Sequence, residues 1–388
     1  MPTTSMIFDK VLTAKSASKQ VDFATMLGVA ARARGVSQVK IAVEAIRRRF
    51  GRQKLSSQDY FRFGLFRPEL TDADRDAFVS DAEISRLNSA LRPSESHSVS
   101  GIISSKIMTE LLLRGVGLPC SQTVAVARAT PAPMPFPVLI GAAAIEEFLR
   151  TADRLPLFGK PDDSSLGVGA ASFVGRNGDE LIFGDGTRTS LSKLAVEIAR
   201  DYPDGYVFQT QLRPHPEVAR LIGPVVGTLR VITLRLKQGP QAMFSMLKMP
   251  GPGAMVDGAL SGANAAALID LASGAILRAQ LGKAPLGQDL VRNHVTGVEL
   301  PGAVLPDFDK AVALALDVHR LFPHLGVLGA DVILSDHGPL INEVNLNPLA
   351  SLAQSAAGRG LFSEANKAMY REALEVQGAS LPVKGVRL

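Results

Sequence analysis

The spacing of apolar residues changes along this chain near residue 97. Before that point apolar positions recur every three or four residues, which is the period of an α-helix with one buried face. Residues 71–91 (TDADRDAFVSDAEISRLNSAL) show this pattern and begin with the Thr and Asp that are typical of a helix start. The polar, turn-forming residues 93–100 (PSESHSVS) come next. We therefore predict a mainly helical N-terminal region over residues 1–97.

Helical and strand-like patterns alternate after residue 97. Helical spacing is found at residues 105–119, 142–150, 191–202 and 308–323. Strand-like runs lie at residues 122–127, 155–161, 206–212 and 227–236, and residues 170–186 form a predicted hairpin that turns at RNGD. Strands joined by short turns and interleaved with helices predict an α+β fold.

A second predicted hairpin, over residues 326–350, carries polar side chains within apolar runs. Glu343 and Asn345 occupy alternate positions, so their side chains point to the same face. With the turn centred on His337, Asp331 lies directly opposite Glu343. Like charges that face each other destabilise a sheet unless they are neutralised. A divalent cation would do so, because Mg²⁺ prefers oxygen ligands and Asn345 adds a neutral one.

The composition is that of an ordinary globular protein, with 46% hydrophobic and 20% charged residues in 388. This length suggests two or three lobes. No apolar run is long enough to span a membrane, and the N-terminus lacks the apolar core of a secretory signal. The single cysteine, Cys120, rules out an internal disulfide and a cysteine-rich zinc site. A cytoplasmic protein is the simplest expectation.

The formal net charge of +5 is concentrated near the N-terminus, and the densest basic run is residues 47–54 (RRRFGRQK). Two interpretations remain open. The run is either a solvated helix end, where Arg favours the negative pole of the helix dipole, or a surface for an anionic substrate, nucleic acid or membrane. Nucleic acid is the least favoured partner, because no interleaved aromatic residues or known nucleic-acid module accompany the run.

Residues 158–173 (FGKPDDSSLGVGAASF) form a candidate phosphate-binding loop. Lys160 ends a predicted strand, and Ser164, Ser165, Gly167 and Gly169 follow before the next strand. Small residues let backbone amides approach phosphate oxygens, and lysine adds positive charge. Taken alone, the same pattern is typical of a plain hairpin turn.

Three further features have both a structural and a functional interpretation. Lys106 opens a predicted helix and by itself is typical of a solvated surface charge. Residues 206–218 (YVFQTQLRPHPEV) run from a strand into a Pro-containing turn, whose exposed backbone could pair with an adenine edge. Arg230 lies in an apolar strand, so it requires an anionic partner, either in a structural salt bridge or in a ligand.

Taken in order, these features resemble the ATP-grasp superfamily. The chain is more closely similar to the group called sugar-transfer-associated ATP-grasp proteins, through DYFRFGLFRPELTDADRDAFVSD, GTLRVITL, NHVTGVELPG and HRLFPHLGVLGADVILSDHGPLINEVN. The resemblance implies two α+β lobes that clasp ATP. The helical region of residues 1–97 would precede a small lobe with the Gly-rich loop (98–205) and a large lobe with the metal hairpin (206–388). The chain departs from its relatives at residues 256–270, around Asp257, and at Ala330, where they tend to have Trp.

The resemblance also implies site roles. Lys106 and Lys160 would contact the α- and β-phosphates under the 164–170 loop, and Arg230 would stabilise the transferring phosphoryl group. The adenine and ribose would meet Gln209, Thr210, Gln211 and Leu212, and Mg²⁺ would be held by Asp331, Glu343 and Asn345.

The implied function is an ATP- and Mg²⁺-dependent carboxylate–amine ligase that acts through an acyl phosphate on small-molecule carboxylate and amine substrates. Phosphoryl transfer of this kind depends on alignment and charge neutralisation. Two alternatives stay open: a phosphotransferase on the same fold, and an accessory protein with impaired catalysis. The sequence does not identify the substrates.

Overall fold

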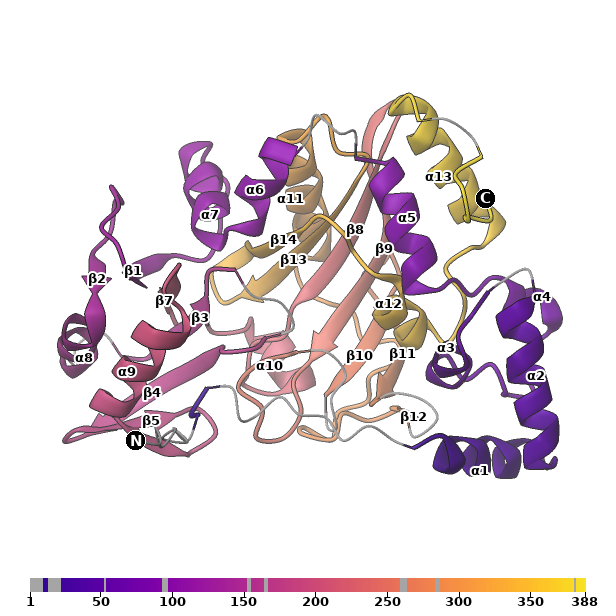
Figure 1. The fold of residues 1–388 in the computed structure, drawn as a ribbon, viewed down its shortest axis with the longest axis horizontal. Coiled ribbons are helices and arrows are strands. Elements are labelled where there is room, and N and C mark those ends of the chain that lie inside the picture. The colour runs from indigo at the N-terminus through magenta and orange to yellow at the C-terminus, as the bar shows by residue number, and fades with distance from the viewer. Residues whose placement is uncertain are drawn as a thin grey trace, which may run out of the picture. The chain divides into compact units, whose positions relative to one another are not determined.

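The computed structural model describes residues 10–12, 22–51, 54–92, 97–151, 155–163, 167–258, 264–282, 287–379 and 382–388. Its helices are α1 (Phe23–Arg34), α2 (Gln38–Phe50), α3 (Ser57–Arg62), α4 (Asp72–Asp76), α5 (Asp81–Ala90), α6 (His97–Ser104), α7 (Lys106–Gly115), α8 (Gly141–Arg150), α9 (Leu191–Asp201), α10 (Pro216–Ile222), α11 (Phe308–Arg320), α12 (Ala350–Ala357) and α13 (Glu364–Val376) (Figure 1).

The strands are β1 (Thr123–Arg128), β2 (Val138–Ile140), β3 (Leu157–Pro161), β4 (Ala171–Asn177), β5 (Glu180–Phe183), β6 (Arg188–Ser190), β7 (Tyr206–Thr210), β8 (Leu229–Leu236), β9 (Gly239–Met249), β10 (Ala265–Ile269), β11 (Ile276–Leu281), β12 (Gln288–Asp289), β13 (Val327–Ser335) and β14 (Gly338–Asn345). The chain divides into two compact units. Unit 1 comprises residues 1–18, 121–212 and 253–256, and unit 2 comprises residues 19–120, 213–252 and 257–388.

Unit 1 is built on a seven-stranded sheet with the order β2-β1-β7-β3-β4-β5-β6. The predicted hairpin of residues 170–186 is present as β4 and β5. Alternate residues of β3 and β7, including Leu157, Tyr206 and Phe208, face the core that α8 and α9 cover. The intervening residues therefore point to the opposite face of the sheet.

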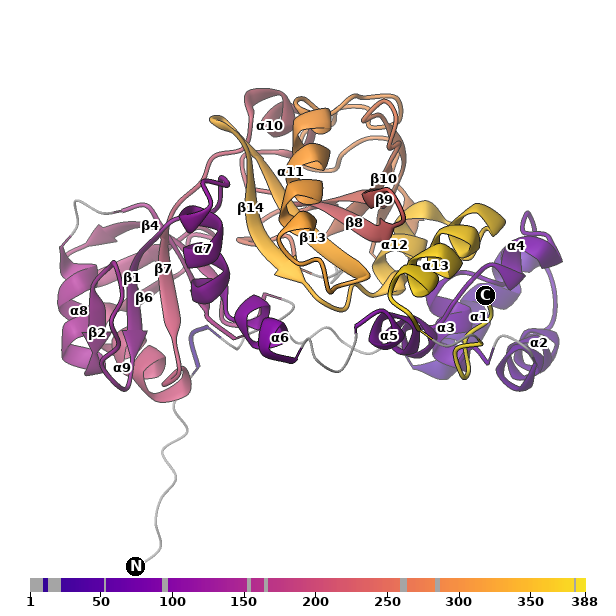
Figure 2. The ribbon, with the colours of Figure 1, turned by 90° about the horizontal axis from the view of Figure 1, so that it is seen from above.

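Unit 2 contains a second seven-stranded sheet, with the order β12-β11-β10-β9-β8-β13-β14. Leu229 and Val231 of β8 face a core that includes α11, whereas Ile232 and Leu234 belong to a core with α5, α12 and α13. Figure 1 shows α11 behind the sheet and α12 in front of it, and Figure 2 shows α11 along β13 and β14. Side chains that alternate along each strand are thus divided between two helix-covered faces.

The N-terminal part of unit 2 is helical, as the apolar spacing predicts. Buried residues of α1, α2 and α3, among them Ile41, Tyr60 and Phe61, form one small core. The predicted helical segment 71–91 is divided into α4 and α5, because Ser80 caps a new helix by accepting a hydrogen bond from the backbone N–H of Glu83.

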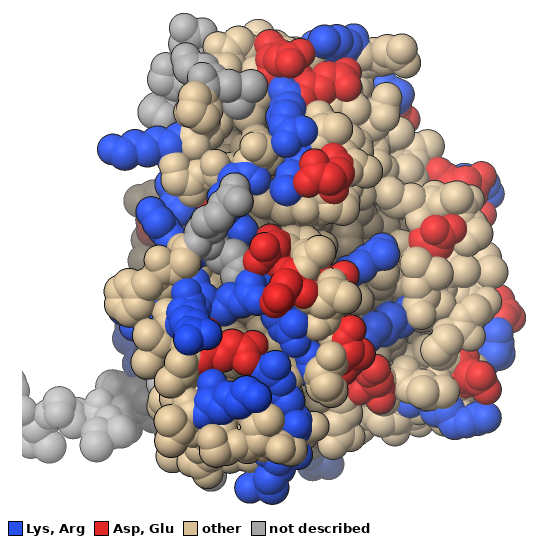
Figure 3. Space-filling view, turned by 90° about the vertical axis from the view of Figure 1, so that its right-hand side faces the viewer, with Lys and Arg blue, Asp and Glu red and all other residues tan. Residues whose placement is uncertain are grey.

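Charge is mixed over the side of the molecule drawn in Figure 3, where Lys and Arg side chains are interspersed with Asp and Glu. In the part of the chain that the structure describes, no helix is both long and apolar enough to cross a membrane.

Candidate functional site

The predicted hairpin of residues 326–350 forms with the expected register. Ser335 pairs with Gly338 around the turn, and Asp331 lies directly opposite Glu343. Asn345 lies opposite Gly329, so it shares a face with Glu343 two residues away. The alternation of polar residues therefore places two carboxylates and an amide together at one end of β13 and β14.

Asp331 has two cationic partners, one on the adjacent strand β8 and one on β9, the strand beyond it. Arg230 of β8 lies opposite Asp331 and donates twice, from Nε to Oδ1 at 2.6 Å and from Nη2 to Oδ2 at 2.8 Å. Lys248 of β9 donates from Nζ to Oδ2 at 2.9 Å. The arginine in the apolar strand thus has the anionic partner that its burial requires, and this partner is a residue of the same sheet.

Burial and pairing act in opposite directions on these charges. Asp331 is only 1% exposed, and burial alone would raise its pKa. Arg230 and Lys248 outweigh that effect and hold the pKa of Asp331 well below its ordinary value. Burial disfavours the charged form of Arg230 too, yet Asp331 raises the pKa of the guanidinium. Both groups therefore stay ionised inside the fold.

Asp257 extends this cluster through Lys248, and sequence reasoning gave neither residue a role. The Lys248 ammonium lies 3.7 Å from Asp257 Oδ2, which accepts hydrogen bonds from the backbone N–H of Thr228, at 2.8 Å, and from its hydroxyl. A lysine inside the apolar strand AMFSMLKM was a signal of the same kind as Arg230.

The side chains of Glu343 and Asn345 have fewer bonding partners than the side chain of Asp331. No hydrogen bond or ion pair joins the Glu343 carboxylate to another residue within the described ranges. The Asn345 Nδ2 atom is buried and has no hydrogen-bond partner. Buried amide groups normally have hydrogen-bond partners. The unpaired Asn345 Nδ2 therefore marks the end of β14 as a place where a ligand could accept the missing hydrogen bond.

The cluster offers oxygen donors of the kind that a divalent cation prefers. Asp331, Glu343 and Asn345 supply two carboxylates and an amide. Together with Asp257 the cluster has three carboxylates, whose formal negative charge exceeds the positive charge of Arg230 and Lys248. No group of three or more His, Cys, Asp or Glu side chains suited to a metal occurs among the residues that the structure describes. A cation held here by three protein ligands would therefore require the Asn345 amide.

Lys160 lies in unit 1, on the face of the sheet that α8 and α9 leave uncovered. It pairs with Val207 and is only 5% exposed, and its ammonium lies 6.0 Å from the centre of the Phe158 ring. Phe158 in turn pairs with Gln209. Lys160 and Gln209 therefore share a face, which is opposite to the core face of this sheet.

The loop after Lys160 depends on glycine. Gly167 and Gly169 have φ angles of 74° and 76°, a conformation that favours glycine. A Cβ at Gly169 would lie 2.5 Å from the Tyr202 hydroxyl, so this position has no room for a side chain. The predicted loop residues Ser164 and Ser165 lie outside the described residues.

The four predicted nucleotide-edge residues follow one another at the end of β7. The Gln209 amide donates to Thr123 Oγ1 at 3.5 Å, and the Thr210 N–H donates to the Gln122 carbonyl at 3.1 Å. The Gln211 side chain accepts from Ser172 Oγ at 2.7 Å and donates to the Leu212 carbonyl at 3.4 Å. The two glutamine amides are therefore held in place by bonds within unit 1.

Lys106 belongs to unit 2, where it begins α7 after the N-cap Ser105. Its side chain is half-buried. The two lysines that sequence reasoning assigned to phosphates thus lie in different units, Lys106 in unit 2 and Lys160 in unit 1.

The family comparison covers most of the chain: residues 88–369 match the model of the sugar-transfer associated ATP-grasp family. No curated protein matches the sequence.

Solved structures show weaker likenesses. A D-alanine-D-alanine ligase from Coxiella burnetii is 14% identical with a TM-score of 0.39, over 72% of this chain and 57% of the ligase. The VanG D-Ala:D-Ser ligase from Enterococcus faecalis is 12% identical with a TM-score of 0.41, over 72% and 62% of the two chains. An N5-carboxyaminoimidazole synthase from Aspergillus clavatus, in complex with ADP and 5-aminoimadazole ribonucleotide, is 14% identical with a TM-score of 0.39, over 80% and 60%.

At these TM-scores the likenesses carry no argument about the activity or site of this chain. The extent of the family match decides the assignment. The chain belongs to the sugar-transfer associated ATP-grasp family, and it has the α+β fold of that family with a helical N-terminal region.

Proposed function

We propose that this chain is an ATP- and Mg²⁺-dependent ligase that joins a carboxylate to an amine through an acyl phosphate. The observation that carries the proposal is the cluster of Asp331, Glu343 and Asn345 beside Arg230 and Lys248, in a member of an ATP-grasp family. Family membership makes ATP the expected substrate, and the cluster has the mixed charge that a metal-bound nucleotide needs.

The proposed reaction has two steps. A carboxylate oxygen of the first substrate attacks the γ-phosphorus of ATP, and the bond from this phosphorus to the bridging oxygen breaks, releasing ADP. The amine nitrogen of the second substrate then attacks the acyl carbon. The bond from this carbon to the phosphate oxygen breaks, inorganic phosphate leaves, and the nitrogen loses a proton to give the amide.

Asp331, Glu343 and Asn345 are the residues proposed to hold Mg²⁺, which when bound would neutralise charge on the phosphates. Asp331 already shares its oxygens with Arg230 and Lys248, whereas no described residue donates a hydrogen bond to the Asn345 side-chain oxygen, the atom that a cation would contact. We assign Glu343 and Asn345 the larger share of the binding, because neither must give up an existing contact.

Arg230 is proposed to act on the transferring phosphoryl group while it holds Asp331. Its guanidinium has more N–H donors than the two that Asp331 accepts, and its side chain is 16% exposed. The pairing therefore leaves donors that can meet a second anion. On the nucleotide side we assign Lys106, Lys160 and the 164–170 loop to the phosphates, and Gln209, Thr210, Gln211 and Leu212 to the base and ribose.

The proposal is tested in two stages. Mixtures of small carboxylates and amines are first screened for those that raise the melting temperature in the presence of ADP and Mg²⁺. The selected compounds are then incubated with ATP and Mg²⁺, and ADP, inorganic phosphate and product mass are measured. We expect equal amounts of ADP, phosphate and amide.

The Glu343→Gln variant should lose turnover, and Glu299→Gln, on an exposed pair with Arg292, is the matched control. A phosphorylated product without inorganic phosphate would instead identify a phosphotransferase. Nucleotide binding without any turnover of the selected compounds would indicate an accessory protein. Both results would overturn the ligase proposal.

A further inference from the structure

Helix α2 has two apolar faces, and only one of them is packed. Ile41 and Ala45 are 0% and 1% exposed and belong to the N-terminal core. Val39, Val43, Ile46 and Phe50 are instead 72%, 43%, 52% and 79% exposed. A single exposed apolar residue is normal on a protein surface, but four on one short helix need an explanation.

The four exposed residues form one stripe. Successive residues of an α-helix are rotated by about 100°, so Val39, Val43, Ile46 and Phe50 fall within a sector roughly 60° wide. The sector lies across the helix from Ile41 and Ala45, the residues that face the core. This outer stripe, defined by these four residues, continues through the whole helix.

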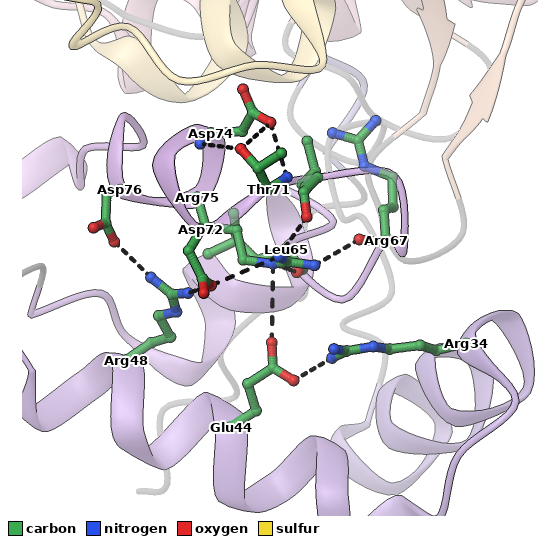
Figure 4. Close-up of polar contacts among 11 residues, drawn as sticks. Arg34, Glu44, Arg48, Leu65, Arg67, Thr71, Asp72, Asp74, Arg75 and Asp76 are labelled. Atoms are coloured by element: carbon green, nitrogen blue, oxygen red, sulfur yellow. Dashed lines mark hydrogen bonds and ion pairs between the residues drawn. The ribbon is translucent and has the colours of Figure 1, made fainter.

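Ion pairs fix the opposite side of α2 and so keep the outer stripe turned away from the core. Arg48 donates to Asp72 at 2.9 Å and to Asp76 at 2.7 Å, and both partners belong to α4. Glu44 contacts Arg34 and lies 3.9 Å from the Arg75 guanidinium. Figure 4 shows Glu44 and Arg48 pointing from α2 toward these partners.

Arg75 anchors the partner side of this network. Its guanidinium is buried and donates to the carbonyl oxygens of Leu65 and Arg67, at 2.8 Å each, and of Leu70. Because the guanidinium is held by backbone carbonyls, the contact with Glu44 ties α2 to a well-bonded segment. The rotation of α2 about its axis is thereby set by charged contacts as well as by the core.

Basic residues border the outer stripe on both sides. Lys40 and Arg47 lie along one edge, and Arg49 lies along the other, with its guanidinium 5.8 Å from the centre of the Phe50 ring. All three are exposed, and within the described part of the chain none of them forms an ion pair. The helix has one acidic residue, Glu44, on the packed side. Its outer half is therefore apolar along the middle and positive along both edges.

We propose that α2 is a docking surface for an anionic lipid bilayer. An apolar ridge bordered by Lys and Arg is the pattern of helices that lie in the membrane interface, where basic groups reach the lipid headgroups while their stems remain on the apolar side. The ion pairs of Figure 4 hold the helix in place before it meets a membrane. Docking therefore requires no folding step.

Other occupants fit the surface less well. In a symmetric dimer through the outer stripe, Arg47 and Arg49 would face the same positive charges of a second copy. A specific protein partner usually engages roughly 20–30 residues on each side, far more than the seven that form the ridge and its edges. A bilayer needs only the apolar ridge and the positive edges.

The test is co-sedimentation of the full-length protein with vesicles. Vesicles of mixed phosphatidylcholine and phosphatidylglycerol should bind the protein, vesicles of phosphatidylcholine alone should not, and added salt should weaken the binding. Arg47→Gln with Arg49→Gln should weaken it about 25-fold, since each basic residue near an anionic surface contributes roughly fivefold. Val43→Ser with Ile46→Ser should weaken it at least tenfold, in the range expected for lost apolar burial.

Matched controls distinguish binding through the outer stripe from non-specific binding to the vesicles. Val196 is 42% exposed on α9 of unit 1, so Val196→Ser should bind as the unaltered protein does. The altered side chains are exposed, and melting temperatures of all variants should agree. The inference is wrong if the unaltered protein does not co-sediment with anionic vesicles, or if the stripe variants bind them as strongly as the unaltered protein does. A change in self-association of the stripe variants without vesicle binding would also overturn it, in favour of a protein contact.

Discussion

Arg230 and Lys248 both neutralise Asp331, but they differ in geometry. The guanidinium binds both carboxylate oxygens, whereas the ammonium binds one and also faces Asp257. Arg230→Met leaves a buried carboxylate with a single cation and should lower the free energy of unfolding by about 3–5 kcal/mol. Lys248→Met should lower it less, because Asp331 keeps its bidentate partner. Urea denaturation measures both.

Arg292→Met removes one member of an exposed pair with Glu299 and serves as the control, with an expected change of at most about 1 kcal/mol. The interpretation of the cluster would be wrong if Lys248→Met cost as much as Arg230→Met.

Asp331 also gives a prediction about acid stability. Because its pKa is lower in the folded protein than the ordinary value of 3.8, its stabilising contribution is fully present above that value. The contribution is lost as the pH falls through the lower pKa of the folded state. Asp331→Asn should therefore be less stable at neutral pH, since Arg230 and Lys248 lose their partner. Its stability should also depend less steeply on pH below 3.8.

Urea titrations between neutral pH and acid, on the unaltered protein and the variant, would show this difference. An Asn variant that is more stable at neutral pH would contradict the pairing. It would support the simpler expectation from the sequence, that repulsion between Asp331 and Glu343 dominates.

At the scale of elements, His319 joins α11 to the sheet of unit 2. Its Nδ1 lies 2.7 Å from Thr233 Oγ1 on β8, and its Nε2 lies 2.9 Å from the Leu325 carbonyl. Burial lowers the pKa of His319 from 6.5 to about 4. The unfolded chain therefore binds a proton between these values that the folded protein does not, so stability rises as the pH rises from 4 to 6.5.

The difference between the two pKa values of His319 corresponds to about 3 kcal/mol in the free energy of unfolding. His319→Gln should flatten the pH dependence of the free energy of unfolding in this range. His337→Gln, at the exposed turn of the β13–β14 hairpin, is the control for removal of an imidazole. Equal slopes in the unaltered protein and in His319→Gln would show that another group governs this range.

The loop between β3 and β4 is the second test at this scale. Gly169→Ala forces a Cβ to within 2.5 Å of the Tyr202 hydroxyl, at a φ of 76°. We expect a loss of about 1–3 kcal/mol in the stability of unit 1. Gly186→Ala is the matched control, because Gly186 has a φ of 81° but nothing within 4 Å of the added Cβ. Thermal unfolding should separate the two, and equal losses would mean that the close approach at Gly169 relaxes at little cost.

At the scale of the whole molecule, the proposed function predicts linked binding of ADP and Mg²⁺. Together they should stabilise the folded protein by about 2.7 kcal/mol at a ligand concentration one hundred times Kd. Chelation of the metal should remove most of the effect. In Glu343→Gln the part that depends on Mg²⁺ should be lost while the unliganded melting temperature stays close to normal, because the Glu343 carboxylate makes no hydrogen bond or ion pair within the described residues.

Melting temperature measured with ADP alone, Mg²⁺ alone and both gives the result directly. Normal Mg²⁺-dependent stabilisation of Glu343→Gln would remove this carboxylate from the proposed metal site. Glu299→Gln should behave as the unaltered protein does.

The sequence by itself determined the features whose causes are local. Apolar spacing predicted the helical N-terminal region, and turn residues with alternating polarity predicted the β13–β14 hairpin and the pairing of Asp331 with Glu343. It also showed that Arg230, in an apolar strand, needs an anion. These predictions succeed because residues a few positions apart fix one another's direction on a helix or in a hairpin.

The tertiary structure decided which distant residues meet. Only the sheet order brings β13 beside β8, and so places Asp331 next to Lys248 and makes Asp331 the anion that Arg230 needs. Likewise, the spacing of α2 is compatible with burial of either of its apolar faces, and the core and ion pairs of the N-terminal helices select the one that is packed. Such choices depend on contacts between segments far apart in the chain, and residue spacing carries no information about these contacts.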